Sequence, residues 1–193
     1  IACFGLTEPG SGSDSAGLQT TAVRSGNGYV LNGTKRYITN APFADVGLIM
    51  ARTAKENLPG NGHVSAFIVP LDTPGVTRGK SDKKMGQPGS HIGDVILDDV
   101  YVPGDALLGG EEGKGFAIAM QSLDNGRLSV GAASTAYARR ALDTAIRYAN
   151  ERKAFGEPIA NFQLIQAMLA DSHAEIYAAE CMMRDAIRKA DEG

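Results

Sequence analysis

Hydroxyl groups and glycines gather near the start of the chain, in a pattern that can bind an anionic cofactor. The segment Leu6–Asp14 carries Thr7, Ser11 and Ser13 among glycines, and a glycine-dense turn leaves main-chain N–H groups free to converge on an anion. Tyr37-Ile38-Thr39 then offers an aromatic ring and one more hydroxyl. Each pattern has a plain alternative, a surface turn for the first and a β-strand for the second.

Turn residues divide the first part of the chain into short runs that are typical of β-strands. Ala22–Ser25 and Tyr29–Leu31 flank Gly26-Asn27-Gly28, where Asn-Gly can take positive φ, so a hairpin is expected. Asn32-Gly33 repeats this turn signal. Further strands are expected at Thr34–Thr39, Val46–Arg52, Val64–Val69 and Val95–Val102. Because no helical segment separates them, we expect a mostly antiparallel barrel or sandwich and not a Rossmann-type domain.

The composition changes near Gly109–Gly113, and two long helices are expected after it. From Phe116 to Arg152 the chain has no proline, and its apolar residues recur every three or four positions, which is the helical period. A second helix is expected from Asn161, a favourable N-cap. Two helices cannot bury both of their faces, so we expect part of an antiparallel helical bundle. The sequence thus predicts a multi-domain α+β fold, with a β domain over residues 1–113 and a helical domain over 114–193.

Composition and charge argue against several function classes. The formal net charge is −3, from 19 basic and 22 acidic residues, so no basic field favours nucleic acid or an anionic membrane. Cys3 and Cys181 lack the spacing of metal ligands, so no metal site is expected, and a reducing cytoplasm fits. No apolar run reaches the roughly 18 residues that span a bilayer. The chain begins without Met in an apolar segment and stops within a helical pattern, which indicates a fragment.

Several sequence blocks together resemble the acyl-CoA dehydrogenase family, in the family's order and over nearly the whole chain. The two most telling are Thr7–Asp14 and Asn32–Asn40. The others follow along the chain: Phe67–Pro70, Asp72–Val76, Val102-Pro103, Gly113–Phe116, Leu123–Arg127 and Glu151–Gly156. The family has an N-terminal helical domain, a middle β domain and a C-terminal helical bundle. The resemblance implies that this chain is the middle domain plus the first two helices of the bundle.

The resemblance also implies an activity. In this family of oxidoreductases FAD lies between the β domain and the helices, a base removes the α-proton of an acyl-CoA thioester, and the β-hydrogen leaves as hydride to the flavin. An electron-transfer flavoprotein then takes the electrons. A homodimer or homotetramer is implied, in the cytoplasm or, in a eukaryote, the mitochondrial matrix. An acyl-CoA oxidase, a flavin monooxygenase on the same scaffold and a non-catalytic flavin- or CoA-binding module stay open as alternatives.

Matching the motifs residue by residue assigns a set that would hold FAD. This set is Phe4, Leu6, Thr7, Gly12, Ser13, Tyr37, Ile38, Thr39, Arg152, Phe155, Phe162 and Gln163. Thr7 would bond the flavin edge, Thr39 would lie near flavin N5, and Tyr37 stands where the family often has tryptophan. The last four residues of the set would contact FAD of a neighbouring subunit. The plain alternative for Arg152 and Phe155 is a helix C-terminal charge followed by a capping apolar residue.

The residues that the resemblance assigns to the substrate are Ser13, Asp124 and Arg127. An Asp–Arg pair one turn apart on a helix is by itself typical of a solvated ion pair. Some relatives carry their catalytic Glu at the position of Gly126, and glycine has no side chain to act as a base. We therefore expect no catalytic base in this chain and place it beyond Gly193, as in most of the family.

Overall fold

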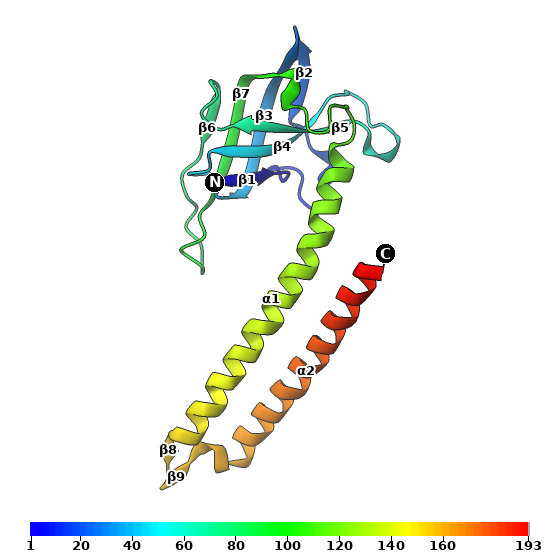
Figure 1. The fold of residues 1–193 in the computed structure, drawn as a ribbon. Helices are drawn as coiled ribbons and strands as arrows, with labels where there is room; N and C mark the ends of the chain where they lie inside the picture. Colours follow the sequence, from blue (N-terminus) through cyan, green and yellow to red (C-terminus); the bar gives the residue numbers. More distant parts are fainter. Residues whose placement is uncertain (193) are drawn as a thin grey trace. The chain divides into compact units, whose positions relative to one another are not determined.

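The computed structural model describes residues 1–192 and divides the chain into two compact units, with the break between Gln121 and Ser122. Figure 1 shows a curled sheet in the first unit and two long helices in the second. The expected combination of a mostly antiparallel β domain with part of a helical bundle is thereby confirmed. The break falls inside the first helix, which begins at Gly115.

Seven strands form the sheet of the first unit. They are β1 (Ala2–Gly5), β2 (Thr21–Ser25), β3 (Gly28–Thr39), β4 (Val46–Arg52), β5 (Val64–Pro70), β6 (Val76–Arg78) and β7 (Ile92–Pro103). Their order in space is β1-β4-β2-β3-β7-β6, and β5 pairs with β4. Two pairings with β4 are parallel, that of β1 and the single pair Thr21 and Arg52, so the sheet is mixed. Figure 1 shows β3 and β7 running across the direction of β4 and β5, which gives the sheet its curl.

The hairpin of β2 and β3 has a different turn from the expected one. Ser25 pairs with Gly28, so Gly26 and Asn27 form the turn, and Gly26 takes the positive φ of 59°. The second expected turn, at Asn32-Gly33, is wrong, because β3 continues through it. There β7 carries the irregularity instead, with Asp98 and Asp99 opposite Asn32.

The core of the first unit lies on the inner face of the sheet. Its large buried side chains are Tyr29, Leu31, Ile49, Phe67, Val69, Leu71, Val95, Leu97 and Val100. Burying each such side chain stabilises a fold by roughly 1.5–3 kcal/mol. Tyr29 and Phe67 pack edge to face with ring centroids 4.9 Å apart. In the first part of β3, the inward side chains are the odd-numbered Tyr29, Leu31 and Lys35, as the alternation of a strand requires.

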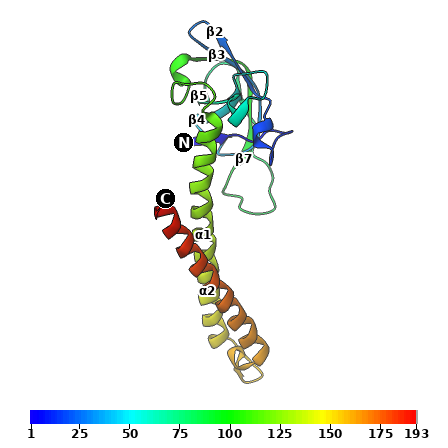
Figure 2. The same cartoon turned by 90° about the vertical axis from the view of Figure 1, so that its right-hand side faces the viewer.

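The second unit is a helical hairpin. The helix α1 (Gly115–Glu151) continues through it, and α2 (Gln163–Glu192) returns antiparallel, as Figures 1 and 2 both show. Arg139 of α1 donates to both carboxylate oxygens of Glu180 on α2, at 3.0 and 2.7 Å. Two short strands, β8 (Lys153–Ala154) and β9 (Glu157–Pro158), form the connection.

The start of α2 corrects the expected N-cap. Asn161 belongs to a 3₁₀ turn, Ile159–Asn161, and its side chain donates to Glu157. The main-chain carbonyl of Phe162 accepts from the N–H groups of Ile165 and Gln166, so Phe162 holds the capping position. The remaining 3₁₀ turns lie in the first unit, at Ser15–Gly17, Pro59–Asn61 and Gly104–Ala106.

Candidate functional site

Two sequence motifs far apart along the chain lie side by side in the first unit. The main-chain N–H of Arg36 donates to the carbonyl oxygen of Thr7 at 2.9 Å. The side chain of Lys35 reaches the same segment, with its Nζ 3.3 Å from the carbonyl oxygen of Leu6. The hydroxyl-rich turn after β1 is thus fixed against β3, directly beside Tyr37.

An irregularity in β3 aims Tyr37 and Thr39 in the same direction. Lys35 pairs with Val95 and Ile38 with Gly93, so Arg36 and Tyr37 together face the single residue between them on β7. This is a β-bulge, and Tyr37 takes a φ of 61° in it. The bulge shifts the alternation by one residue. As a result Lys35 and Ile38 are both buried, while Tyr37 and Thr39 are both exposed.

The ring of Tyr37 is supported from one side. The guanidinium of Arg36 lies over it, 4.4 Å from the ring centroid. Arg36 is held in turn by Asp94 at 2.7 Å and Asp82 at 3.2 Å, and these bonds raise its pKa. Tyr37 nevertheless keeps 64% of its surface exposed. Positive φ in a bulky residue costs roughly 1–3 kcal/mol and such strain gathers at functional sites, so this exposed, oriented ring is a candidate contact for a ligand.

The hydroxyl-rich turn is closed by its own first residues and leaves its tip open. Glu8 and Ser11 exchange two main-chain hydrogen bonds, at 2.9 and 3.2 Å, and the Ser11 hydroxyl donates to the carbonyl of Asp14. A Cβ atom built on Gly10 or Gly12 meets nothing within 4 Å, and neither residue has positive φ. Packing within residues 1–192 therefore does not demand glycine at either position. Space at the tip is what a close ligand needs.

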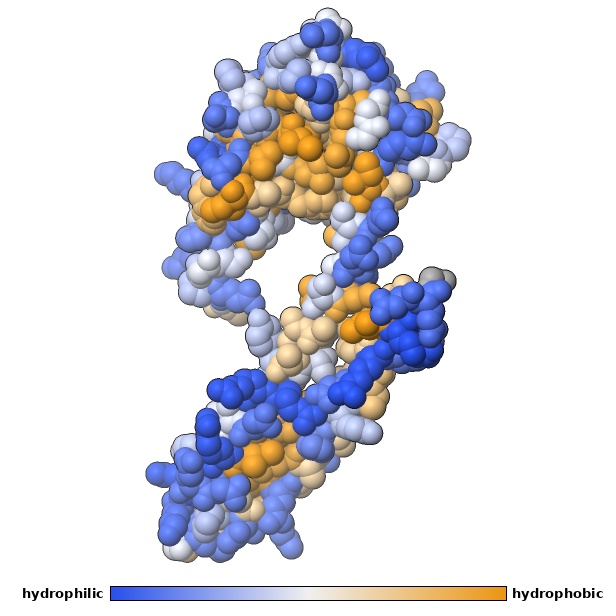
Figure 3. Space-filling view, viewed as in Figure 1, coloured by the Kyte–Doolittle hydropathy of each residue, from blue (hydrophilic) through white to orange (hydrophobic). Residues whose placement is uncertain are grey.

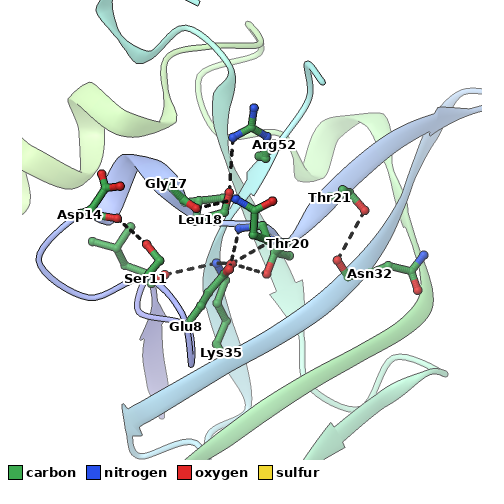
Figure 4. A network of polar contacts seen from close by, with 12 residues as sticks. Glu8, Ser11, Asp14, Gly17, Leu18, Thr20, Thr21, Asn32, Lys35 and Arg52 are labelled. Carbon is green, nitrogen blue, oxygen red and sulfur yellow. Dashed lines mark hydrogen bonds and ion pairs between the residues drawn. The ribbon is translucent and has the colours of Figure 1, made fainter. Parts of the chain in front are cut away.

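Behind this turn lies a buried ion pair, shown in Figure 4. Lys35 Nζ donates to Glu8 Oε1 at 2.7 Å, and Glu8 also accepts from Gln19 N, Thr20 N and the Thr20 hydroxyl. Burial alone would raise the pKa of Glu8, but the charge and hydrogen bond of Lys35, with the other donors, hold it below its ordinary value. Burial lowers the pKa of Lys35 to about 8, because Glu8 offsets only part of that effect. At neutral pH the pair is ionised.

The expected cofactor-binding residues of this unit differ in how far they are exposed to solvent. Gly12, Ser13, Tyr37 and Thr39 are exposed, and Phe4 and Thr7 are half-buried. Leu6 and Ile38 are buried, and Ile38 belongs to the core. A role of these two residues in binding a cofactor would therefore not use their side chains as they lie in this structure.

The expected substrate residues of the second unit form an exposed pair. Arg127 and Asp124 make an ion pair one turn apart on α1, with side chains 66% and 71% exposed. Such a pair contributes little to stability. The geometry by itself is that of the solvated pair, and both charged groups are accessible.

The connection between α1 and α2 presents the remaining expected residues. Phe155 and Gly156 form a two-residue turn between β8 and β9, with φ of 54° and 89°. Phe155 is 98% exposed and lies edge-on to Phe162, with centroids 6.2 Å apart. Arg152 and Gln163 are exposed as well. Phe155 is thus a bulky side chain held at positive φ and facing solvent, and such backbone strain gathers at functional sites.

Comparison with known proteins decides the family. Residues 3–100 match the model of the acyl-CoA dehydrogenase middle domain, and residues 113–193 match that of the acyl-CoA dehydrogenase C-terminal domain. The chain belongs to the acyl-CoA dehydrogenase family. This result confirms the resemblance on which the expected site residues depend.

Individual acyl-CoA dehydrogenase relatives agree with the family models. The chain is 48% identical over 95% of its length to the caffeyl-CoA reductase-Etf complex subunit CarC of Acetobacterium woodii. It is 44% identical over 94% of its length to the mitochondrial short-chain specific acyl-CoA dehydrogenase of Homo sapiens. It covers 48% and 43% of these proteins, so the chain spans about half the length of the curated relatives it matches.

A solved acyl-CoA dehydrogenase has the same fold. The crystal structure of the Bacillus anthracis acyl-CoA dehydrogenase complexed with FAD superposes with a TM-score of 0.86 at 45% identity, over 94% of this chain and 30% of that one. The mixed, curled sheet followed by long helices is thus the fold of the acyl-CoA dehydrogenase family.

Two structural features of this acyl-CoA dehydrogenase domain escaped the sequence analysis. The Glu8–Lys35 pair is one, although Lys35 has the same odd-numbered phase as buried Tyr29 and Leu31, a signal that it points inward. The side chain of His63 is the other. It is buried, its Nδ1 accepts from the N–H of Leu58, and its Nε2 lies 3.0 Å from the carbonyl oxygen of Ala16.

Two further searches cover the described residues of this acyl-CoA dehydrogenase family member. Within residues 1–192, no three His, Cys, Asp or Glu side chains cluster as metal ligands would. None of the helices in the same range combines the length and the apolar character that a membrane crossing requires.

Proposed function

We propose that the protein catalyses α,β-dehydrogenation of an acyl-CoA thioester with FAD as the hydride acceptor. Family membership supports this reaction class, and a structural relative of the chain is an acyl-CoA dehydrogenase complexed with FAD. The single observation that carries the proposal is the bulge in β3. It turns Tyr37 and Thr39 toward solvent together, next to the main-chain bond between Arg36 and Thr7.

The residues of the first unit fit a flavin. The exposed Tyr37 ring offers a flat apolar surface on which a ring system can stack. Thr7 and Thr39 have hydroxyl groups that can donate hydrogen bonds, and the open tip at Gly12 and Ser13 suits a phosphate oxygen. When bound, FAD supplies an acceptor for the hydride that leaves the β-carbon. The role proposed for Thr39 is a hydrogen bond to the position where negative charge then develops.

The proposed substrate contacts follow the family motifs in each unit. Ser13 would donate to the thioester or to a cofactor phosphate, Asp124 would meet the CoA moiety, and Arg127 would order the acyl end and the catalytic carboxylate. Gly126 provides no base. Within the first unit, the Glu8 carboxylate is occupied by Lys35, Gln19 and Thr20. We therefore propose that a carboxylate outside residues 1–193 removes the α-proton.

A second subunit is proposed to complete the cofactor site. Arg152 has the planar fork that suits a pyrophosphate, and Phe155 is an exposed ring that can cover adenine. Phe162 and Gln163 follow at the start of α2. In a homodimer or homotetramer, these residues would contact FAD of the neighbouring subunit. An electron-transfer flavoprotein is the proposed electron acceptor, in line with the Etf complex named for the Acetobacterium relative.

The test is a panel of acyl-CoA thioesters of different chain length and branching, given to the full-length protein with an artificial dye as electron acceptor. We expect bound FAD, bleaching of its absorbance by one thioester class without oxygen, and dye reduction. Rapid peroxide formation by the reduced protein in air would instead assign an oxidase or a monooxygenase. FAD or CoA binding without bleaching by any thioester would assign a non-catalytic module.

The reverse direction is a second candidate, because a relative 48% identical to this chain is named as a caffeyl-CoA reductase subunit. The two directions need the same flavin contacts and differ in which thioester and which redox partner are used. Steady-state rates separate them. Faster turnover with a 2-enoyl-CoA and a reduced electron donor than with the saturated thioester and an oxidised dye would favour the reductase.

A further inference from the structure

The Glu8–Lys35 ion pair is more deeply buried than any other in the described part of the chain. The Lys35 side chain is 0% exposed and that of Glu8 is 6% exposed. Every hydrogen-bonding atom of the pair has a partner, since Glu8 Oε1 accepts from Lys35 and Thr20, Glu8 Oε2 accepts from Gln19, and Lys35 also donates to Leu6. A buried charge pair this complete holds its neighbours in one geometry.

The arrangement around this pair requires a glycine at position 33, beside Thr20. A Cβ on Gly33 would lie 2.4 Å from the Thr20 hydroxyl oxygen and 2.7 Å from the Thr20 Cα. Only glycine at position 33 therefore lets Thr20 approach Glu8. Desolvating two charges is unfavourable, and apolar residues of similar volume in place of a buried ion pair often leave stability equal or higher. Stability alone is thus a weak reason for this arrangement.

The position of the pair suggests what it does. Glu8 directly follows Thr7, and Lys35 directly precedes the bulge at Arg36 and Tyr37. Since Lys35 points inward and Tyr37 outward, the pair lies on the core side of the β3 surface to which FAD is assigned. Figure 4 shows the side chains of Glu8 and Lys35 meeting. It joins the two motifs by side chains where Arg36 and Thr7 join them by main chain.

We propose that Glu8 and Lys35 are positioning residues that fix the spacing between the Thr7–Ser13 turn and Tyr37–Thr39, so that one flavin can contact both. This inference rests on the proposed function, in which FAD binds at the surface formed by these two segments. For this role, which residue carries the positive and which the negative charge matters less than the fixed distance between the two segments. If the spacing between the two segments is looser, a ligand that bridges both segments binds with lower affinity, because binding must then also order the turn.

A double variant separates positioning from stability. In the full-length protein, Glu8→Gln with Lys35→Met removes both buried charges while keeping similar volume. We expect the thermal midpoint of the apoprotein to stay within a few degrees of wild type, while the dissociation constant for FAD rises about tenfold or more. The matched control is Arg139→Met with Glu180→Gln, an ion pair on the helical hairpin, for which FAD affinity should not change.

A conservative variant keeps the test decisive if the double variant does not fold. Glu8→Asp retains both charges but shortens the carboxylate side chain, so the turn must shift toward Lys35. We expect weaker FAD binding and a slower flavin bleaching rate at saturating thioester, with little change in the thioester KM. FAD affinity equal to wild type in the double variant, or in Glu8→Asp, overturns the positioning role. A wild-type protein that binds no FAD instead refutes the proposed function.

Discussion

The main-chain N–H of Arg36 donates to the carbonyl oxygen of Thr7 at 2.9 Å. Through this bond the start of the Thr7–Asp14 motif meets the Asn32–Asn40 motif, although the two residues are far apart in sequence. Tyr37 follows Arg36 on the exposed side of the bulge. The segment that carries Thr7 is therefore held beside the segment of β3 that carries Tyr37.

Thr39→Val tests the hydroxyl assigned to flavin N5. Valine keeps the shape of threonine but cannot donate, and loss of one donor at developing charge slows a reaction by roughly 10²–10³-fold where the donor is fully engaged. We expect flavin reduction by thioester to slow at least tenfold in stopped-flow measurements, with normal FAD content. Thr77→Val, at an exposed position on β6, is the control. Reduction at the wild-type rate would count against the role of Thr39.

Ser13→Ala tests the anion-binding tip of the turn. A hydrogen bond to a charged group contributes about 1.5–3 kcal/mol, so the affinity for FAD, the CoA thioester or both should fall about tenfold or more. Titration with each ligand measures the change. Ser25→Ala, also an exposed serine, should bind both ligands as wild type does. Unchanged affinity for both ligands in Ser13→Ala would refute the assignment.

Gly12→Val should affect ligand binding, whereas Gly33→Ala should affect stability. A side chain at position 12 meets nothing in this chain, so Gly12→Val should leave the unfolding midpoint unchanged and weaken ligand binding about tenfold by filling the open tip. Alanine at position 33 collides with Thr20, which should cost about 1–3 kcal/mol of stability. Calorimetry and FAD titration distinguish the two. Normal ligand binding by Gly12→Val would contradict the proposal that the open tip of the turn binds a ligand.

Phe155→Asn tests the exposed ring at the end of the helical hairpin. Asparagine tolerates the positive φ of this turn, and the ring is 98% exposed, so the fold and its unfolding midpoint should not change. We expect lower FAD retention, because the adenine loses its cover from the neighbouring subunit. Flavin content after gel filtration and the oligomeric mass together measure this. Full FAD retention in an intact oligomer would argue against a contact between subunits.

The pKa of Lys35 gives stability a defined pH dependence. Burial lowers this pKa from 10.5 to about 8, so between these values the unfolded chain holds a proton that the folded chain has lost. The contribution of this group to the free energy of unfolding therefore rises with pH from about 8 to 10.5, by up to roughly 3 kcal/mol. Urea unfolding of wild type and Lys35→Met at both pH values isolates the effect. An equal pH dependence in both proteins would contradict it.

The long elements were predictable from sequence because their patterns are regular. The helix expected over Phe116–Arg152 is observed at Gly115–Glu151, since its apolar period persists over many turns. Strands β4 and β5 were expected for similar reasons. Strands β1 and β6 are short, and pairing with β4 and β7 defines them. Such tertiary pairing leaves little local signal.

For the candidate site, the sequence indicated a set of motifs but not their geometry. Hydroxyl and glycine spacing pointed to Thr7, Gly12, Ser13 and Tyr37. The bulge could not be expected, because one extra residue in a strand changes the phase of all later side chains without changing composition. That shift is why Ile38 is buried instead of facing a ligand. A lysine in the core likewise contradicts the rule that buried positions are apolar.

A crystal structure of the full-length protein with FAD tests the central claim most directly. We expect the flavin ring against Tyr37, with the hydroxyls of Thr7 and Thr39 within hydrogen-bonding distance of it and a phosphate oxygen near Ser13. The Glu8–Lys35 pair should lie unchanged behind them. A flavin bound elsewhere on the protein, with Tyr37 and Thr39 making no contact with it, would contradict the assignment of FAD to this surface.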